Sequence, residues 1–236
     1  MKKIECLKNI KIAHRGLWNE DYPENSIGAF LRCIEKNIPI EFDVHLLKDN
    51  TLVVFHDNNL KRMTEKNILL KDTNYEAIKN YRLKNSEYKI PTLDEVLRLV
   101  DGKVLLDIEL KSDVKGFKIC KEICKYLDKY DGDFIIKSFN PFYIFWFRIN
   151  RPNFIRGLLV SKLSKSDMNK ICKYILFKMW FNFLAKPDFI AFNHKNLPNK
   201  KIERYKDRGL PILLFTVKEK NISNFNDYNY GYLFEE

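Results

Sequence analysis

Two histidines near the start of the chain have the type and spacing that proton transfer requires. His14 follows a short β-branched run, and His56 follows a second apolar run. The ordinary pKa of histidine is about 6.5, so two of them can act as general acid and general base near neutral pH. The sequence therefore indicates acid–base chemistry at His14 and His56. We interpret His45 and His194 as core or surface residues whose rings are satisfied by neighbouring groups.

Carboxylates alternate with apolar residues along two predicted strands. Glu41 and Asp43 share one face of the first strand, and Glu109 and Lys111 share one face of the second. Buried charges are costly unless they are paired, and a bound cation would remove that cost. All-oxygen ligands suit Mg²⁺ or Ca²⁺, whereas zinc prefers His or Cys. We therefore predict a divalent metal on Glu41, Asp43 and Glu109, against the alternatives of a surface acidic pair and a simple Glu109–Lys111 salt bridge.

Three other polar residues lie close to these positions. Arg15 carries a planar fork of donors that suits phosphate oxygens, although it could equally be an ordinary surface arginine. Asn25 and Ser26 are typical helix-capping residues. We interpret Asp57 as a turn former, because it follows His56 directly at the end of an apolar run.

Strand-like and helix-like segments alternate along the chain and must position these groups. Eight principal strands are predicted at residues 11–14, 39–44, 104–110, 134–139, 154–160, 188–192, 211–217 and 230–234, with residues 51–55 as an extra strand. Helices are predicted after the caps Ser26, Thr92 (a capping box with Glu95), Asn140 and Ser166, and over residues 117–127, 200–206 and 219–226.

This order predicts an α/β fold, the TIM (β/α)₈ barrel, as a single domain over residues 1–236. A doubly wound open sheet is the alternative, but no Gly-x-Gly-x-x-Gly follows the first strand. Catalytic groups of a TIM barrel lie at the C-terminal ends of its strands. The candidate residues fall at such ends.

Composition limits the class of protein and its partners. The chain has 236 residues and a formal net charge of +11. Its lysines are spread along the whole sequence, which indicates a solvated surface, so we expect no nucleic-acid partner. The five cysteines follow no disulfide framework, and Cys120 and Cys124 have the spacing of one buried helix face.

Location follows from the same features. The first nine residues contain no apolar core of a signal peptide. The apolar stretch 171–192 is interrupted by Lys173, Lys178, Lys186 and Asp188, so it does not meet the requirement of about 20 apolar residues for a membrane span. With unpaired cysteines, these features predict a cytoplasmic protein.

The motifs together resemble the glycerophosphodiester phosphodiesterases over essentially the whole chain. The matching segments are His14-Arg15-Gly16, Pro23-Glu24-Asn25-Ser26, Ala29-Phe30, Glu41-Phe42-Asp43-Val44, Lys48-Asp49-Asn50, Val53-Val54-Phe55-His56-Asp57, Pro91-Thr92-Leu93-Asp94-Glu95-Val96-Leu97, Ile108-Glu109-Leu110-Lys111, Ser138-Phe139 and Phe215-Thr216-Val217. Each motif alone is weak, but their shared order is highly specific.

The resemblance implies metal-dependent hydrolysis of glycerophosphodiesters, small molecules, to glycerol 3-phosphate and an alcohol. It implies that His14 and His56 form the acid–base pair, and that Arg15 and Lys111 contact the phosphate. It also assigns Mg²⁺ or Ca²⁺ to the three carboxylates. A small insertion at residues 58–90, after the second strand, would cover the site.

Several positions depart from the family pattern. Phe215 and Lys218 replace a tryptophan and an asparagine, and Asp107 stands where the family often has asparagine. The C-terminal motif of the family is reduced to the last seven residues. None of these changes removes a proposed catalytic or metal-binding residue, but the substitutions at Phe215 and Lys218 leave the alcohol group of the substrate open.

Two other functions remain open. The same chemistry could act on lysophospholipids or sphingomyelin at a membrane surface, through aromatic residues at 142–147 and 180–183 that are set among lysines. The alternative for these aromatics is the buried face of outer helices. A non-catalytic phosphate-binding or nucleic-acid-binding module is a third possibility, but it would not need two histidines and three inward carboxylates. The oligomeric state is not predicted.

Overall fold

The structure is a computed structural model that describes residues 7–112, 116–162, 177, 179–228 and 230–236. The chain divides into two compact units. The first contains Ala13–Phe134 and Glu236, and the second contains Met1–Ile12 and Ile135–Glu235. The helix predicted after Ser166 begins outside the described residues.

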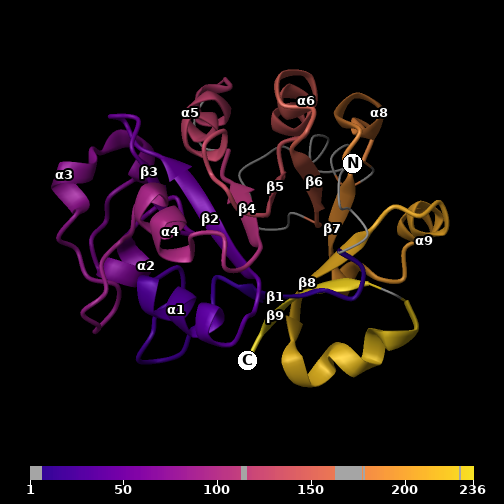
Figure 1. Ribbon diagram of the computed structural model, residues 1–236, viewed down its shortest axis with the longest axis horizontal. Coiled ribbons are helices and arrows are strands. Elements are labelled where there is room, and N and C mark those ends of the chain that lie inside the picture. The colour runs from indigo at the N-terminus through magenta and orange to yellow at the C-terminus, as the bar shows by residue number, and fades with distance from the viewer. Residues whose placement is uncertain (1–6, 113–115, 163–176, 178, 229) are drawn as a thin grey trace. The chain divides into compact units, whose positions relative to one another are not determined.

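The first unit contains three parallel strands and the helices that follow them. Its elements in chain order are the end of β1 (Lys11–His14), α1 (Ile27–Glu35), β2 (Ile40–Leu46), β3 (Leu52–Val54), α2 (Lys61–Thr64), the 3₁₀ helix η2 (Leu70–Asp72), α3 (Tyr75–Ile78), α4 (Leu93–Val100), β4 (Leu106–Leu110) and α5 (Lys118–Leu127) (Figure 1). Strand β2 pairs in parallel with both β1 and β4. The extra strand β3 returns antiparallel to the end of β2, as a hairpin.

Local capping explains where the helices of this unit begin. The Ser26 hydroxyl accepts a hydrogen bond from the backbone N–H of Ala29, three residues into the first helical turn. Thr92 and Glu95 form the predicted capping box at the start of α4. In α5 the two cysteines, Cys120 and Cys124, lie on the buried face, which confirms their predicted place in the core.

The segment between β3 and α4 has an apolar core of its own. Helices α2 and α3 and the 3₁₀ helix η2 all lie within the predicted insertion, residues 58–90. Its buried side chains pack together with those of the adjoining hairpin, and the cluster consists of Leu47, Val53, Phe55, Leu60, Met63, Leu70, Ile78, Leu83 and Ile90. The insertion is therefore held to the hairpin by side-chain packing as well as by chain connection.

The second unit contains the remaining parallel strands. Its elements are β5 (Phe134–Ser138), α6 (Pro141–Asn150), β6 (Ile155–Val160), α8 (Asn182–Ala185), β7 (Phe189–Asn193), the 3₁₀ helix η3 (His194–Asn196), α9 (Lys200–Asp207), β8 (Ile212–Lys218), the 3₁₀ helix η4 (Glu219–Tyr228) and β9 (Gly231–Glu235). Each strand from β5 to β9 pairs in parallel with the next along the chain.

The eight parallel strands and the helices between them confirm the predicted TIM (β/α)₈ fold class. Two details differ from the prediction. Strand β2 extends to Leu46 because its last three residues also pair with β3. Residues 219–228 form a 3₁₀ helix, and this segment is rich in Asn and Ser, whose side chains compete for backbone hydrogen bonds. Within the described ranges, no helix combines the length and the apolar character needed to cross a membrane.

Candidate active site

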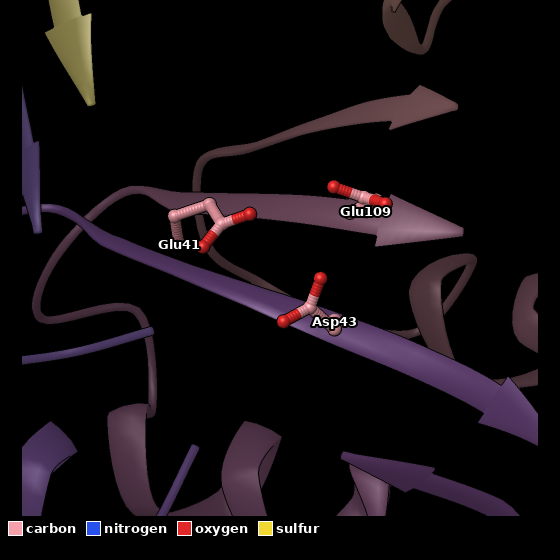
Figure 2. A group of neighbouring side chains, drawn as sticks. All are labelled: Glu41, Asp43 and Glu109. Carbon is pink, nitrogen blue, oxygen red and sulfur yellow. The ribbon is translucent and has the colours of Figure 1, made fainter. Parts of the chain in front are cut away.

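The three carboxylates predicted to bind metal meet on two neighbouring strands of the first unit. Glu41 and Asp43 lie on β2, and Glu109 lies on β4, directly opposite Asp43 in the parallel register. One carboxylate oxygen from each lies within 4.8 Å of the other two. All three residues are buried. Figure 2 shows the carboxylates gathered over the two strands, as the alternation of the sequence predicts.

Two cations contact this carboxylate cluster. The Lys111 ammonium lies 2.7 Å from Asp43 Oδ1 and 2.6 Å from Glu109 Oε1. The Arg15 backbone N–H donates to Glu41 Oε2 at 2.9 Å, and its Nε lies 3.6 Å from Asp43 Oδ2. The salt bridge considered for Glu109 and Lys111 is therefore present, but the same ammonium also contacts Asp43.

These contacts shift the protonation equilibria of the site. Burial by itself would raise the pKa of Asp43, but the charges of Lys111, His56 and Arg15 hold it well below its ordinary value. Burial would likewise lower the pKa of Lys111, yet Asp43 and Glu109 raise it above its ordinary value. At neutral pH the cluster is therefore fully charged at Asp43 and Lys111.

The loop after β1 holds an unusual backbone that aims Arg15 at the cluster. Arg15 and Asn25 both have left-handed backbone angles, with φ of 61° and 56°. The Asn25 N–H donates to the Arg15 carbonyl at 3.0 Å, and the Asn25 side chain donates to Asp43 Oδ2 at 2.9 Å. At Gly16 φ is +81°, and a Cβ there would lie 2.9 Å from Ala29 Cβ. The turn thus requires glycine at that position.

The structure places both predicted acid–base histidines beside the strands that carry the cluster. His14 is the last residue of β1 and lies opposite Glu41 in the parallel register. The Phe55 N–H donates to the Asp43 carbonyl at 3.0 Å, which places His56 next to the same strand. The His56 side chain is 34% exposed, so its ring can be reached from solvent.

The other two described histidines have structural contacts. His45 is fully buried, and its Nε2 lies 3.2 Å from the His56 carbonyl. In the second unit, His194 Nδ1 lies 3.2 Å from the Phe215 carbonyl. Both contacts agree with the sequence interpretation of His45 and His194 as satisfied residues.

Four polar residues near the site were not recognised as functional from the sequence. Asn25, read there as a cap, binds Asp43 instead, while Asp57 contacts His56 Nδ1 through an oxygen at 2.6 Å. Arg62 donates hydrogen bonds to Glu24 and to Asp57, and Glu24 also accepts a hydrogen bond from Arg15. No local pattern could reveal the pairing of Glu24 with Arg62, because 38 residues separate them.

The residues present fit a divalent cation. Three buried carboxylates lie against the side chains of Lys111 and Arg15, so negative charge is concentrated at one buried place. The ligand atoms on offer are all oxygens, which favours a hard cation over zinc. A divalent ion held by Glu41, Asp43 and Glu109 would compensate that charge.

Comparison with known sequences identifies a family to which the chain belongs. A family model described as "Glycerophosphoryl diester phosphodiesterase family" matches residues 14–233. A protein of Caldanaerobacter subterraneus named glycerophosphodiester phosphodiesterase is 36% identical over 166 residues, which are 65% of this chain and 67% of that protein. A human protein named lysophospholipase D is 29% identical over 129 residues, 49% of this chain and 41% of that one.

Solved structures agree with the fold. A phosphodiesterase of Oleispira antarctica, solved in complex with the product sn-glycerol-3-phosphate, superimposes with a TM-score of 0.82 at 21% identity. The superposition covers 98% of this chain and 94% of that chain. A similarity of this extent at low identity supports the TIM-barrel fold described above.

Proposed function

Because the chain belongs to the glycerophosphoryl diester phosphodiesterase family, and is an enzyme of that kind, we propose that it hydrolyses glycerophosphodiesters to glycerol 3-phosphate and an alcohol. The observation that carries this proposal is the buried cluster of Glu41, Asp43 and Glu109, with Arg15 and Lys111 against it. A phosphodiester carries one negative charge, and two fixed cations beside a metal site suit it.

In this proposal, metal binding and phosphate binding are assigned to different residues. Glu41, Asp43 and Glu109 would hold Mg²⁺ or Ca²⁺, which supplies neutralisation of phosphate charge when it is bound. Arg15 and Lys111 would bind and orient the phosphate oxygens. The cluster is buried, so these charges act in a medium where water screens them weakly.

His14 and His56 would carry the protons. One histidine takes the proton from the attacking hydroxyl as its oxygen bonds to phosphorus, and the other gives a proton to the alcohol oxygen as the second phosphorus–oxygen bond breaks. The attacking hydroxyl belongs either to water or to the glycerol of the substrate itself. In the second case water must open a cyclic phosphate afterwards to give glycerol 3-phosphate. The assignment of acid and base to the two rings stays open.

Replacement of His14 tests this assignment. We expect H14A to reduce the hydrolysis of glycerophosphocholine, measured with Mg²⁺, with Ca²⁺ and with chelator, by about 10²-fold or more. H194A is the matched control, since His194 contacts a backbone carbonyl of the second unit. Undiminished hydrolysis by H14A would refute its catalytic role, while hydrolysis that is indifferent to chelator would refute the metal.

A second candidate is cleavage of lysophospholipids at an anionic membrane surface. Aromatic side chains near α8 favour it, since Trp180 is 58% exposed and Phe183 is 70% exposed. A hollow of about 580 Å³ is lined by Phe183 together with Lys186 and Arg208, so apolar and basic groups adjoin there. In α6, by contrast, Tyr143, Ile144 and Phe147 are buried, as expected for an outer helix, and Phe142 is exposed.

Vesicle binding separates this candidate from the first. We expect W180A/F183A to weaken co-sedimentation with phosphatidylserine vesicles and to slow lysolipid cleavage, while hydrolysis of glycerophosphocholine stays unchanged. Each basic residue near such a surface contributes about 1 kcal/mol, so binding should also weaken at high salt. L69A, which removes a half-exposed apolar side chain of the insertion, is the control. Equal vesicle binding by the wild type, W180A/F183A and L69A would exclude this surface as a membrane-binding site.

The location of the protein in the cytoplasm is also a proposal. Its support is chemical: Cys33, Cys120 and Cys124 are buried free thiols, a state that a reducing compartment maintains. Burial raises the pKa of Cys33 to about 12, so this thiol is not reactive at neutral pH. Fluorescence microscopy of the tagged chain in its native cell would test the location.

A further inference from the structure

Arg62, in helix α2 of the insertion, makes contacts that the proposed mechanism does not use. Its guanidinium donates to two different carboxylates. Nε lies 2.6 Å from Asp57 Oδ2 and Nη2 lies 3.2 Å from Asp57 Oδ1. Nη1 lies 2.8 Å from Glu24 Oε2 and Nη2 lies 2.7 Å from Glu24 Oε1. A single arginine therefore joins the loop before α1 to the loop after β3.

Each of these two carboxylates also holds a residue of the proposed mechanism. Asp57 Oδ1 lies 2.6 Å from His56 Nδ1. Glu24 Oε1 accepts a hydrogen bond from Arg15 Nη1 at 2.8 Å. Arg62 is thus one residue removed from an acid–base histidine on one side and from a phosphate-binding arginine on the other.

The Arg62 guanidinium balances the negative charges of two carboxylates, Glu24 and Asp57. The side chain of Glu24 is 9% exposed and that of Asp57 is 27% exposed. Burial would raise the pKa of Glu24, but its hydrogen bond with Arg62 and the charge of Arg15 lower it. The pKa of Asp57 is also lowered, since hydrogen bonds with His56 and Arg62 outweigh burial. Both groups are therefore carboxylates at neutral pH.

The position of Arg62 is set by packing. The next residue, Met63, is 2% exposed and belongs to the apolar cluster that holds the insertion to the β2–β3 hairpin. The Arg62 side chain donates hydrogen bonds to Glu24, Asp57 and Met63, none of which is a candidate metal ligand. An effect of Arg62 on the reaction would thus pass through His56 and Arg15.

We propose that Arg62 is a positioning residue, through which the insertion orients both His56 and Arg15 for the phosphodiester reaction. When Asp57 accepts the Nδ1–H of the neutral ring, Nε2 is left to exchange the proton with the substrate. Glu24 holds one arm of Arg15 and so fixes the direction of its remaining donors. This inference rests on the proposed function, since both oriented groups belong to it.

Kinetics of R62K and R62M test the proposal. We expect R62M to lower kcat for glycerophosphocholine by 10- to 100-fold, a typical loss when an orienting contact is removed, and to raise KM less. R62K should restore only part of kcat, because an ammonium cannot make two parallel pairs of hydrogen bonds. Mg²⁺ or Ca²⁺ affinity, measured by calorimetry, should stay within about twofold. K61M, which removes an exposed charge from the same helix, should match the wild type.

The tautomer of His56 gives a readout that does not depend on turnover. Nitrogen-15 spectra of the histidine rings should show the neutral His56 ring of the wild type protonated at Nδ1, and a mixture of tautomers in R62M and in D57N. If R62M does not fold, the same nitrogen-15 spectra of R62K test whether Arg62 sets the His56 tautomer. A kcat within twofold of the wild type in R62K and R62M, or an unchanged His56 tautomer, would overturn the proposal. A wild-type enzyme that does not hydrolyse glycerophosphodiesters would refute the proposed function instead, while the spectra would still report on Arg62.

Discussion

Two groups of buried charges, one in each compact unit, are built in opposite ways. In the first unit, the three carboxylates of Glu41, Asp43 and Glu109 gather around the side chains of Lys111 and Arg15. In the second unit, Arg156 on β6 pairs with Asp188, just before β7, through Nη1 and Oδ2 at 3.3 Å. The second group pairs one guanidinium with one carboxylate, and the charge of Arg148 also acts on Arg156.

The protonation equilibria of the two arginines reflect this difference. Burial lowers the pKa of Arg156 below its ordinary value, and the charge of Asp188 does not compensate for it. Burial acts in the same direction on Arg15, but Asp43, Glu24 and Glu41 together raise its pKa. A surplus of carboxylates around a cation is costly to fold, so it indicates a site kept for binding, whereas a balanced pair is sufficient for structure.

The two groups of charges also differ in where they lie along their strands. Asp188 also accepts the Arg156 N–H at 3.1 Å and donates its own N–H to the Arg156 carbonyl at 2.8 Å, at the N-terminal ends of β6 and β7. Glu109 lies near the C-terminal end of β4 and Lys111 lies just beyond it, whereas Glu41 and Asp43 lie within β2. In TIM barrels the C-terminal strand ends carry function and the N-terminal ends carry stability.

The largest expected effect would come from removing a charge of the carboxylate cluster. Glu41→Gln keeps the acceptor for the Arg15 N–H but lowers the negative charge that would hold the cation. We expect kcat/KM for glycerophosphocholine to fall about 10³-fold, equivalent to about 4 kcal/mol. The increase of the melting temperature on addition of Mg²⁺ or Ca²⁺ should shrink in parallel. Activity within about threefold of the wild type would contradict the interpretation of the carboxylate cluster as a functional site.

Breaking the balanced pair should affect stability instead of activity. Asp188→Asn leaves the Arg156 charge, with its side chain 8% exposed, without its partner charge. We expect a loss of about 3 kcal/mol in the free energy of unfolding, measured with urea. At a temperature where the variant stays folded, its kcat should equal that of the wild type. A large loss of kcat with unchanged stability would show that this pair is not purely structural.

Sequence patterns were sufficient where the determining contacts are local or periodic. The caps at Ser26 and Thr92 depend on residues three apart, and both are present. Glu41, Asp43 and Glu109 could be assembled because alternation and parallel pairing together place them on one face. Their roles as metal ligands, like those of His14 and His56 in catalysis, stay predictions.

Long-range polar contacts could not be predicted in this way. Asp57 follows a histidine, and a turn former and a histidine partner have the same local sequence. Arg62 meets Glu24 across 38 residues, with a geometry that depends on how the insertion packs. The extension of β2 to Leu46 likewise depends on its hairpin partner, β3. Such features become visible when the fold is known.

Acid should weaken the first unit through the carboxylates whose pKa values are lowered. Since the pKa of Glu24 is lower in the folded chain than in the unfolded chain, its stabilising contribution is present above about pH 4.5 and is lost as pH falls through the folded value. Each such group changes the stability by at most about 1.4 kcal/mol per pH unit. In urea titrations with chelator between pH 3 and 7, Glu24→Gln should be less stable than the wild type at pH 7. Its stability should change less below pH 4.5, and an equal slope in both proteins would contradict the lowered pKa.

The smallest effect is expected when both charges of the balanced pair are removed. In R156M/D188N the amide oxygen can still accept the N–H of residue 156, and the methionine side chain occupies much of the space of the arginine stem. Because neither charge then needs to be desolvated, the double variant should recover most of the stability that D188N loses, ending within about 1 kcal/mol of the wild type. No equivalent neutral replacement should exist for the carboxylate cluster if it holds a cation, since its concentrated negative charge is the property that binds. If R156M/D188N recovers stability and keeps full kcat, the Arg156–Asp188 pair serves only to stabilise the fold. If E41Q loses activity, the carboxylate cluster serves the reaction, and the two results together therefore distinguish the two groups of charges.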